Sequence, residues 1–554
     1  MIQVLCLTLA MVLGTDPAAA APAAKAIGSR HYVDAAAGAD TNPGTAEAPW
    51  KTWARAQTGP IRPGATVYCT GELGPVQITA KDPVGKAGAP ITYARWPDRS
   101  TPHITTLKFD PENLRDVHLV FQEFRFDPGF VPTSGPNVNN AVNLEGANHV
   151  AFESCEFEGP KLAGNPQGDF APYCILEREL CPTFTSGDAG NASYISIRNC
   201  TFANSSTCVR FSENAAMPQK RVEHWEILGC EFTSGAEDAI LATRGADLTV
   251  SGCRFSNQNY AKSAIHWPGT AHGTWPANYT WGKCTQDGTG ASALFYRMGA
   301  DGHGQTRIYM LPDDKEHLPR RSQYGIWRLD SDPTNIYFEP SGRGECPHTD
   351  CIAVQGPVRG MLIENNRFEV LPQSGQIIKL DPCGGHPEKV VIQNNLFLAT
   401  PDAPTYMMCI GGGVGTIIRH NTIYAGTAHM RRGLRVFGTS PDPMDVTLCN
   451  NIISGGGWQK GVPPKSDYNC WIVAPPEEIK EGPHSIVVPG LAALGCLDAT
   501  NLDFRLTESS PCINKGNPEQ APGVSKEHPE GIDHARTDRD AEPDIGAYEY
   551  VKKE

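Results

Sequence analysis

Seven side chains between residues 210 and 350 could transfer protons or carry the charges that catalysis needs. An imidazole or amine can remove a proton, and a guanidinium can neutralise a neighbouring negative charge. Two carboxyls that flank one bond can act as acid and base. The candidate catalytic residues are Arg210, Glu237, Asp238, Lys262, His266, His348 and Asp350.

A short repeat supplies the elements that must position these residues. Each copy is an alternating strand-type run that ends in a small or amide residue, as in EHWEILGCEF and VVIQNNLF, and is too short to bury an apolar face alone. The turn residues of the copies are Cys155, Cys200, Cys230, Cys253, Asn366, Asn395, Asn421 and Asn451. Most intervals are about one coil of a β-solenoid, so the copies must stack on one another.

The repeat resembles that of the right-handed parallel β-helix (pectin-lyase-like) superfamily of secreted polysaccharide lyases and glycoside hydrolases. The resemblance implies an all-β fold, in which strands stack about 4.8 Å apart and turn asparagines form hydrogen-bonded ladders. It leaves the activity open, because this architecture hosts lyases, hydrolases, epimerases and non-catalytic adhesins. The end of the chain, from LDFRLTESSPCINKGNP to EPDIGAYEY, is similar to the terminal segment of many secreted bacterial β-helix proteins.

The chain divides into four expected parts. Residues 1–21 have an apolar core followed by alanines, as in a secretory signal peptide, and predict a secreted, periplasmic or cell-surface protein. Residues 30–100 should form an N-terminal cap and the first rungs, residues 101–495 the parallel β-helix, and residues 496–554 the C-terminal strands and cap. An insertion at 267–346 interrupts the repeat. Beyond the N-terminus no apolar run of 18 or more residues suggests a membrane span, and we expect a monomer.

The cysteines suggest a second kind of ladder. Loss of Cys6 with the signal peptide would leave 17 of the 18 cysteines, so at least one thiol cannot be paired within the chain. The four turn cysteines favour a ladder of packed thiols over bridges between rungs. Outside the ladder, Cys174 with Cys181, and Cys470 with Cys496 or Cys512, are the better disulfide candidates.

The net charge of −14 excludes most nucleic-acid binders, and no basic stripe with interleaved aromatic residues is present. An anionic polysaccharide would therefore need a local basic patch or a bridging cation. Asp350 is a candidate calcium ligand, and no other cofactor is expected.

Strand alternation predicts which side chains face outward. Alignment of the strand before each ladder strand places Val142, Val209, Ile240, Ile265 and Ile352 inward, and Asn143, Arg210, Leu241, His266 and Ala353 outward. Arg210 and His266 would then lie two rungs apart, about 10 Å. Glu237 and Asp238 would start the rung between them. His348 and Asp350 would start the rung after His266, which is two rungs from Asp238.

The insertion is rich in aromatic residues. Its QTRIYML and YGIWRL runs predict a small antiparallel hairpin or subdomain. Because sugars stack on aromatic rings, Trp267, Trp275 and Trp281 are candidate substrate contacts. The alternative is that these rings form the insertion's own small core.

Three functions remain open. In a polysaccharide lyase, His266 or Lys262 removes a proton next to a uronate carboxylate that Arg210 or a cation neutralises. In an inverting glycoside hydrolase of polygalacturonase-like type, Asp238 and Asp350 flank the bond at about 6.5 to 9.5 Å from each other. In a non-catalytic carbohydrate-binding protein, the polar patch is only a satisfied network.

Overall fold

The structure is a computed structural model that describes most of the chain from residue 28 onward. The described residues are 28–110, 116–131, 140–159, 161–162, 182–186, 192–203, 205, 207–213, 221–233, 238–256, 279–286, 292–298, 306–309, 325–329, 332–339, 350–370, 376–382, 385–399, 406–437, 445–460, 462–522 and 533–552. The predicted signal peptide lies outside them. Within these ranges, no helix is long and apolar enough to cross a bilayer.

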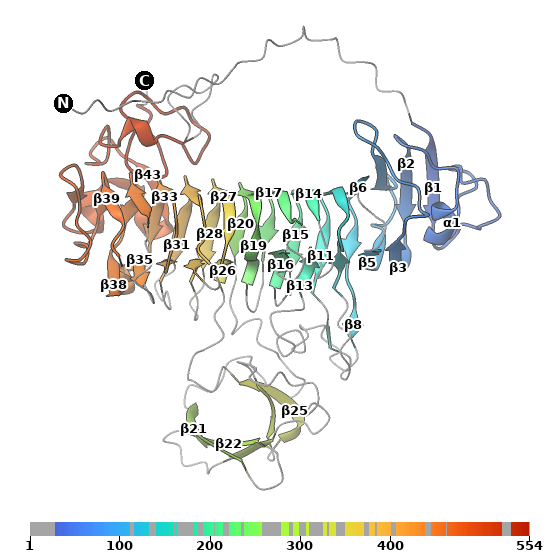
Figure 1. Cartoon of the computed structure of the whole chain (residues 1–554), viewed down its shortest axis with the longest axis horizontal. Helices are drawn as coiled ribbons and strands as arrows, with labels where there is room; N and C mark the ends of the chain where they lie inside the picture. The colour runs from blue at the N-terminus through green and yellow to red at the C-terminus, as the bar shows by residue number, and fades with distance from the viewer. Residues whose placement is uncertain are drawn as a thin grey trace, which may run out of the picture.

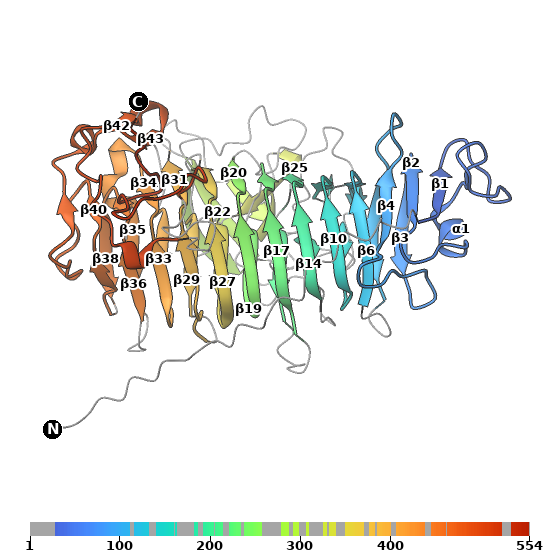
Figure 2. The same ribbon diagram turned by 90° about the horizontal axis from the view of Figure 1, so that it is seen from above.

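The chain coils into a rod whose main sheet has 34 strands (Figures 1 and 2). Its strands pair in parallel with the strands one coil before and one coil after them. This confirms the predicted all-β parallel β-helix. Each coil contributes to three stacks of strands. No coil is long enough to form a core by itself, so the coils must pack on one another.

The first stack contains the strand that precedes each ladder turn. Its members are β1 (Arg30–Asp34), β2 (Thr66–Thr70), β4 (Ile91–Arg95), β6 (Asp116–Gln122), β10 (Asn148–Glu153), β14 (Ser193–Arg198), β17 (Glu223–Leu228), the second half of β19 (Asp238–Ser251), β27 (Val358–Glu364), β30 (Val391–Gln393), β33 (Thr416–Arg419), β36 (Val446–Cys449) and β39 (Lys465–Asp467).

The second stack contains the short strand that follows the turn. Its members are β7 (Arg125–Phe126), β11 (Glu156–Glu158), β15 (Thr201–Ala203), β18 (Glu231–Phe232), β20 (Arg254–Ser256), β28 (Arg367–Val370), β31 (Leu396–Ala399), β34 (Thr422–Tyr424), β37 (Ile452–Ile453), β40 (Cys470–Trp471) and β41 (Ile486–Val487).

The third stack closes each coil and carries the candidate site. Its members are β3 (Glu72–Ile78), β5 (His103–Phe109), β9 (Val142–Asn143), β13 (Pro182–Thr185), β16 (Thr207–Ser212), the first half of β19, β26 (Asp350–Gln355), β29 (Ile378–Asp381), β32 (Met408–Ile410), β35 (Leu434–Phe437) and β38 (Gly456–Lys460).

Aromatic rings fill the core in register. Each second-stack strand from β7 to β31 places one phenylalanine against the next, with ring centroids 4.6 to 5.1 Å apart. The stacked residues are Phe126, Phe157, Phe202, Phe232, Phe255, Phe368 and Phe397. The apolar residue after each turn in the sequence repeat therefore holds neighbouring rungs together.

The predicted asparagine ladder is present and runs one rung further than expected. The backbone N–H of Asn395 donates to Oδ1 of Asn421 at 3.0 Å, and the Asn395 amide donates to the same oxygen and to the Ile363 carbonyl. Asn451 makes the same contacts with Asn469, which extends the ladder. All ladder amides are fully buried, so they satisfy backbone groups that water cannot reach.

Asn395→Leu and Asn421→Leu should each lower the free energy of unfolding by about 1 to 3 kcal/mol, because the leucine leaves buried backbone groups unpaired. The midpoint of urea unfolding measures this loss. Asn501→Leu, at an exposed position of the short 3-10 helix η4 (Ala499–Asn501), should change stability by less than about 0.5 kcal/mol. Equal unfolding midpoints for all three variants would show that the asparagine ladder does not stabilise the fold.

The four turn cysteines form the expected thiol ladder and no bridges. Cys155, Cys200, Cys230 and Cys253 are buried free thiols, and the N–H of Cys155 donates to the sulfur of Cys200 at 3.3 Å. The disulfides expected near the C-terminus are not formed, since Cys470, Cys496 and Cys512 are also free. Cys174 and Cys181 lie outside the described residues.

The N-terminal end of the rod is covered, and a second apolar cluster lies outside the core near the C-terminus. The short helix α1 (Trp53–Gln57) packs Trp53 on Tyr93, with ring centroids 4.4 Å apart. This helix excludes water from apolar core that an open coil would expose. Near the other end, β42 (Cys496–Asp498) and β43 (Asp503–Leu506) form a small antiparallel pair, and Phe504 packs on Tyr424 of the second stack with ring centroids 5.0 Å apart.

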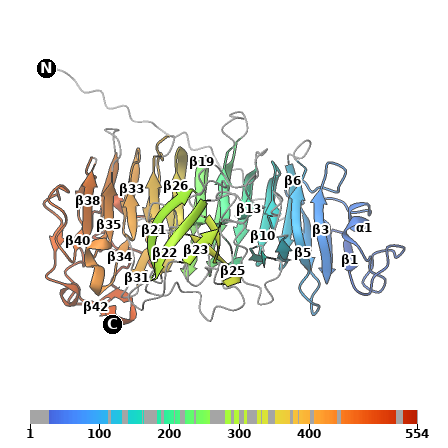
Figure 3. The same ribbon diagram turned by 90° about the horizontal axis from the view of Figure 1, so that it is seen from below.

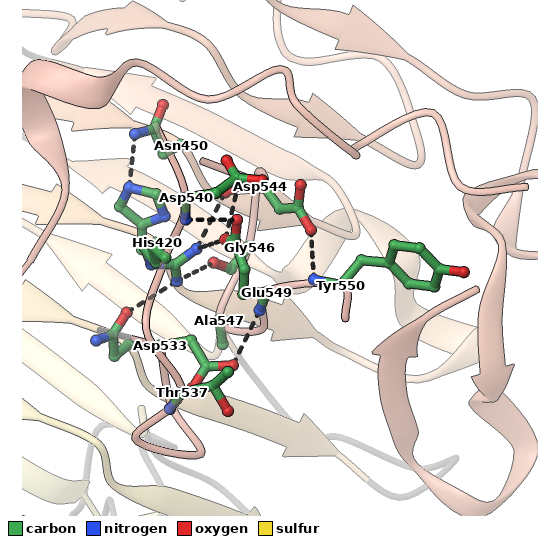
Figure 4. Close-up of polar contacts among 12 residues, drawn as sticks. His420, Asn450, Asp533, Thr537, Asp540, Asp544, Gly546, Ala547, Glu549 and Tyr550 are labelled. Carbon is green, nitrogen blue, oxygen red and sulfur yellow. Dashed lines mark hydrogen bonds and ion pairs between the residues drawn. The ribbon is translucent and has the colours of Figure 1, made fainter. Parts of the chain in front are cut away.

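The last residues turn back over the ladder turns and bury a charged network, shown in Figure 4. Arg539 pairs with Glu549 at 2.8 Å, with the two side chains 0% and 4% exposed, and also donates to Oδ1 of Asn394. Asp533 and Asp544 are buried beside them, so three carboxylates share one cation. Burial and the charge of Asp544 therefore raise the pKa of Glu549 to about 7, against the opposing effect of Arg539.

The insertion forms a separate sheet of five antiparallel strands, as predicted. These are β21 (Tyr279–Gln286), β22 (Ser292–Met298), β23 (Thr306–Tyr309), β24 (Gly325–Leu329) and β25 (Asp332–Glu339). The strands of QTRIYML and YGIWRL pair directly, with Ile308 opposite Leu329. The expected insertion at 267–346 lies within the gap between β20, which ends at Ser256, and β26, which begins at Asp350.

Candidate functional site

Many of the longest stretches of sequence between consecutive strands end at the N-terminal edge of the third stack. The segments before β9, β13, β26, β29 and β32 all lead into this edge, and the five-stranded sheet is inserted before β26. Figures 1 and 3 show that sheet on the third-stack side of the rod. Because binding and catalytic residues concentrate on loops held by a rigid scaffold, this edge is the candidate site.

The strand register confirms most of the predicted alignment. Val209 pairs with Ile240 and Ile240 with Ile352, and these side chains are fully buried in the core. The next residue of each strand faces outward, in a column that runs along the rod. Its members are Lys108, Asn143, Thr185, Arg210, Leu241, Ala353, Lys379, Cys409, Arg435 and Gly457.

One predicted rung is wrong. The first half of β19 is paired with β16 on one edge and with β26 on the other, so no strand from the SAIHW segment lies between them. The rung after Asp238, which the alignment assigned to His266, is therefore occupied by β26. His266 and Lys262 lie outside the described residues, as do Glu237, His348, Trp267 and Trp275.

Asp238 and Asp350 are closer than predicted. They are register partners on adjacent rungs, so their backbones are about 4.8 Å apart instead of two rungs. The inverting hydrolase hypothesis relied on the two-rung spacing, and that spacing is wrong. Trp281 lies on β21 opposite Tyr296, and its role as a sugar contact stays a prediction.

The two aspartates are buried. Asp238 is 2% exposed and Asp350 is 0% exposed, and Oδ1 of Asp350 accepts a hydrogen bond from the N–H of Gln376 at 2.6 Å. In this arrangement neither carboxylate can touch a polysaccharide directly. Their negative charges instead change the pKa of neighbouring side chains.

Lys379 is the neighbour most affected. Its side chain is 18% exposed, and Nζ lies 3.1 Å from Oδ2 of Asp381. Burial lowers the pKa of Lys379, but the charges of Asp350, Asp381 and Asp238 outweigh burial, so the pKa is raised. Lys379 is therefore a cation at neutral pH and suits charge neutralisation better than proton removal.

Arg435 and Arg210 extend the positive charge along the rod. Arg435 lies two rungs beyond Lys379, about 10 Å away, with its guanidinium 5.1 Å from the ring centroid of Tyr406. Arg210 lies three rungs before Lys379, about 14 Å away, and is half-buried. We call Arg210, Lys379 and Arg435 the basic row.

Lys379 and Arg435 were not among the predicted site residues, although the strand alternation in the sequence indicates both of them. The less regular strands near 375 and 433 follow the same alternation, so an inward Ile378 and Leu434 require an outward Lys379 and Arg435. Between these cations the column holds the buried Leu241, Ala353 and Cys409. The row is therefore a set of separated charges on a largely apolar face.

No family model matches the sequence, and no curated protein does. Among solved structures, the chain is similar to XylC in complex with xylose, at 9% identity over 95% of this chain and 99% of that one, with a TM-score of 0.46. It is also similar to a rhamnogalacturonan lyase, at 13% identity over 95% and 96% of the two chains, with a TM-score of 0.36. An alginate lyase from Paenibacillus sp. str. FPU-7 matches at 11% identity over 74% and 96%, with a TM-score of 0.33. The fold assignment itself rests on the strand pairings of this chain.

Proposed function

We propose that the protein is a secreted, monomeric polysaccharide lyase that binds an anionic polysaccharide along the third stack and cleaves it by β-elimination. The observation that carries this proposal is the basic row on a protein whose net charge is −14. A polyanion would otherwise be repelled, so a local row of cations on the third stack favours a polyanionic ligand. The row runs along the rod axis, the direction in which a long substrate can lie across many rungs.

Lys379 has the properties that β-elimination requires of a charge-neutralising group. The proton on the carbon next to a uronate carboxylate becomes acidic enough to remove only when the carboxylate charge is neutralised. Lys379 supplies a positive charge that Asp350, Asp381 and Asp238 keep in place. The electron pair of the broken C–H bond then forms a carbon–carbon double bond, while the glycosidic C–O bond breaks and its oxygen takes up a proton.

The base in this scheme stays a prediction from the sequence. His266 is the preferred candidate, because a neutral imidazole can take a proton near pH 7. Arg210 and Arg435 would bind further carboxylates of the same polymer on either side of Lys379. Trp275 and Trp281 of the insertion remain candidate sugar contacts.

The products distinguish the proposal from its alternatives. The purified protein should be incubated with polygalacturonate, alginate and a glucuronate-containing polymer, and with neutral xylan and cellulose. We expect new reducing ends together with the ultraviolet absorbance of an unsaturated uronyl end, on at least one acidic polymer. Reducing ends without that absorbance would indicate a hydrolase, and binding without cleavage would indicate a non-catalytic protein.

A further inference from the structure

The ring of Tyr406 lies along the rod at the C-terminal end of the basic row. Tyr406 comes two residues before β32, yet its side chain reaches the next two strands of the third stack, β35 and β38. The Arg435 guanidinium of β35 lies 5.1 Å from the ring centroid. A Cβ atom added at Gly457 of β38 would lie 2.9 Å from the Tyr406 hydroxyl oxygen and 3.2 Å from its Cε1. The side chain therefore extends across two rungs on the outer face of the stack.

Gly457 leaves the room that this ring occupies. It is the register partner of Arg435 in the outward column, where every other residue carries a side chain. The backbone of Gly457 is not left-handed, so no turn requires a glycine there. Glycine weakens a strand and often marks a place where another group approaches closely. Here that group is the Tyr406 ring, which an alanine at position 457 would force to move.

The ring is held in place but is not covered. Tyr406, Arg435 and Gly457 are each half-buried, whereas Cys409 of the same column is buried. The guanidinium fixes the ring by a cation–π contact. A side chain that is already fixed loses little freedom when a ligand binds, so its contact contributes more to affinity. Since sugars stack on aromatic rings, a fixed ring at the end of a row of cations suits one sugar unit of a charged polymer.

We infer that Tyr406 forms a distal binding subsite for a sugar unit of the acidic polymer, and that Gly457 positions its ring there. This inference rests on the proposed function, because the polymer must follow the basic row. Gly457 lies three rungs beyond Lys379, about 14 Å away. A trisaccharide bound across Lys379 ends before that rung, whereas an octasaccharide can extend over it. Tyr406 therefore favours long chains and takes no part in the chemical step.

Chain length separates this role from a structural one. A trisaccharide and an octasaccharide of the polymer that the protein cleaves are compared by kcat/KM. Tyr406→Ala should lower kcat/KM for the octasaccharide on the order of 10-fold and leave the trisaccharide within about twofold. Tyr406→Phe keeps the ring and should act as the wild type does. Tyr194→Ala is the matched control, because Tyr194 is a 49% exposed ring on the first stack.

Gly457→Ala tests the same subsite without changing the tyrosine. Its methyl group should displace the ring and lower kcat/KM for the octasaccharide on the order of 10-fold, as Tyr406→Ala does. When Tyr406 is already alanine, adding Gly457→Ala should have no further effect, because the ring that it displaces is gone. Thermal melting of both variants checks the fold, and if Tyr406→Ala does not fold, Gly457→Ala alone carries the test.

The subsite and the lyase activity fail in different ways. Equal losses for the trisaccharide and the octasaccharide in Tyr406→Ala would overturn the subsite, as would additive losses in the double variant. A wild type that cleaves or binds acidic oligosaccharides without unsaturated product would overturn the lyase alone, and the same comparison would then use reducing ends or affinity. A wild type that neither binds nor cleaves an acidic oligosaccharide would overturn both.

Discussion

Lys379→Met should lower kcat/KM for polysaccharide cleavage by about 100- to 1,000-fold, the usual loss when one preorganised stabilising group is removed from a developing negative charge. Methionine keeps most of the side chain's length and apolar contact, so the effect reports the missing charge. The rate of increase in ultraviolet absorbance from unsaturated product measures the loss. KM should also rise, because the same ammonium binds the ground-state carboxylate.

Lys389→Met is the matched control for that experiment. Lys389 is exposed, lies two residues before β30 of the first stack, and is outside the basic row. Its replacement removes one positive charge from the protein without changing the third stack, so activity should stay within about twofold. Equal activity of the Lys379 and Lys389 variants would contradict the proposed role of Lys379.

Arg539→Met should lower the free energy of unfolding by about 3 to 5 kcal/mol, the second large effect that we expect. The substitution removes the guanidinium that pairs with Glu549 and leaves the buried carboxylates of Glu549, Asp544 and Asp533, which Figure 4 shows, without it. The C-terminal segment should then detach from the ladder turns at Asn394 and His420. Urea unfolding followed by tryptophan fluorescence measures the loss.

An exposed ion pair of the same composition provides the comparison. Arg505 contacts Asp503 with its side chain 60% exposed, so Arg505→Met should cost between 0 and about 1 kcal/mol. Adding Glu549→Gln to Arg539→Met should recover part of the lost stability, because one uncompensated charge is removed. A small effect of Arg539→Met would show that the segment is held by its apolar contacts instead.

The fold was predictable because its signals are local and repeated. The turn residue and the phenylalanine after it recur in each copy, and a parallel solenoid is the arrangement that brings such copies into register. The ladder from Asn366 to Asn451 and the thiols from Cys155 to Cys253 follow from that register. Asn469 was missed because the sequence around it no longer resembles the repeat.

The site was only partly predictable because strand pairing is not local. The SAIHW segment has the alternation of a rung, but alternation does not tell which strand lies beside it. The pairing of β19 with β26 fills the place that it would take. The burial of Asp238 and Asp350, and hence their action through Lys379, also depends on parts of the chain that are far apart in sequence.

The way the inserted sheet joins the coil has a consequence for how such a protein can diversify. The chain leaves after β20 and returns at β26, yet β20 pairs directly with β28 and β19 with β26. The described strands between residues 257 and 349, β21–β25, pair with one another and add no strand to the 34-stranded sheet. Exchange of this module would therefore keep the strand pairings of the rod, so the module can change in evolution while the stability of the rod is inherited intact.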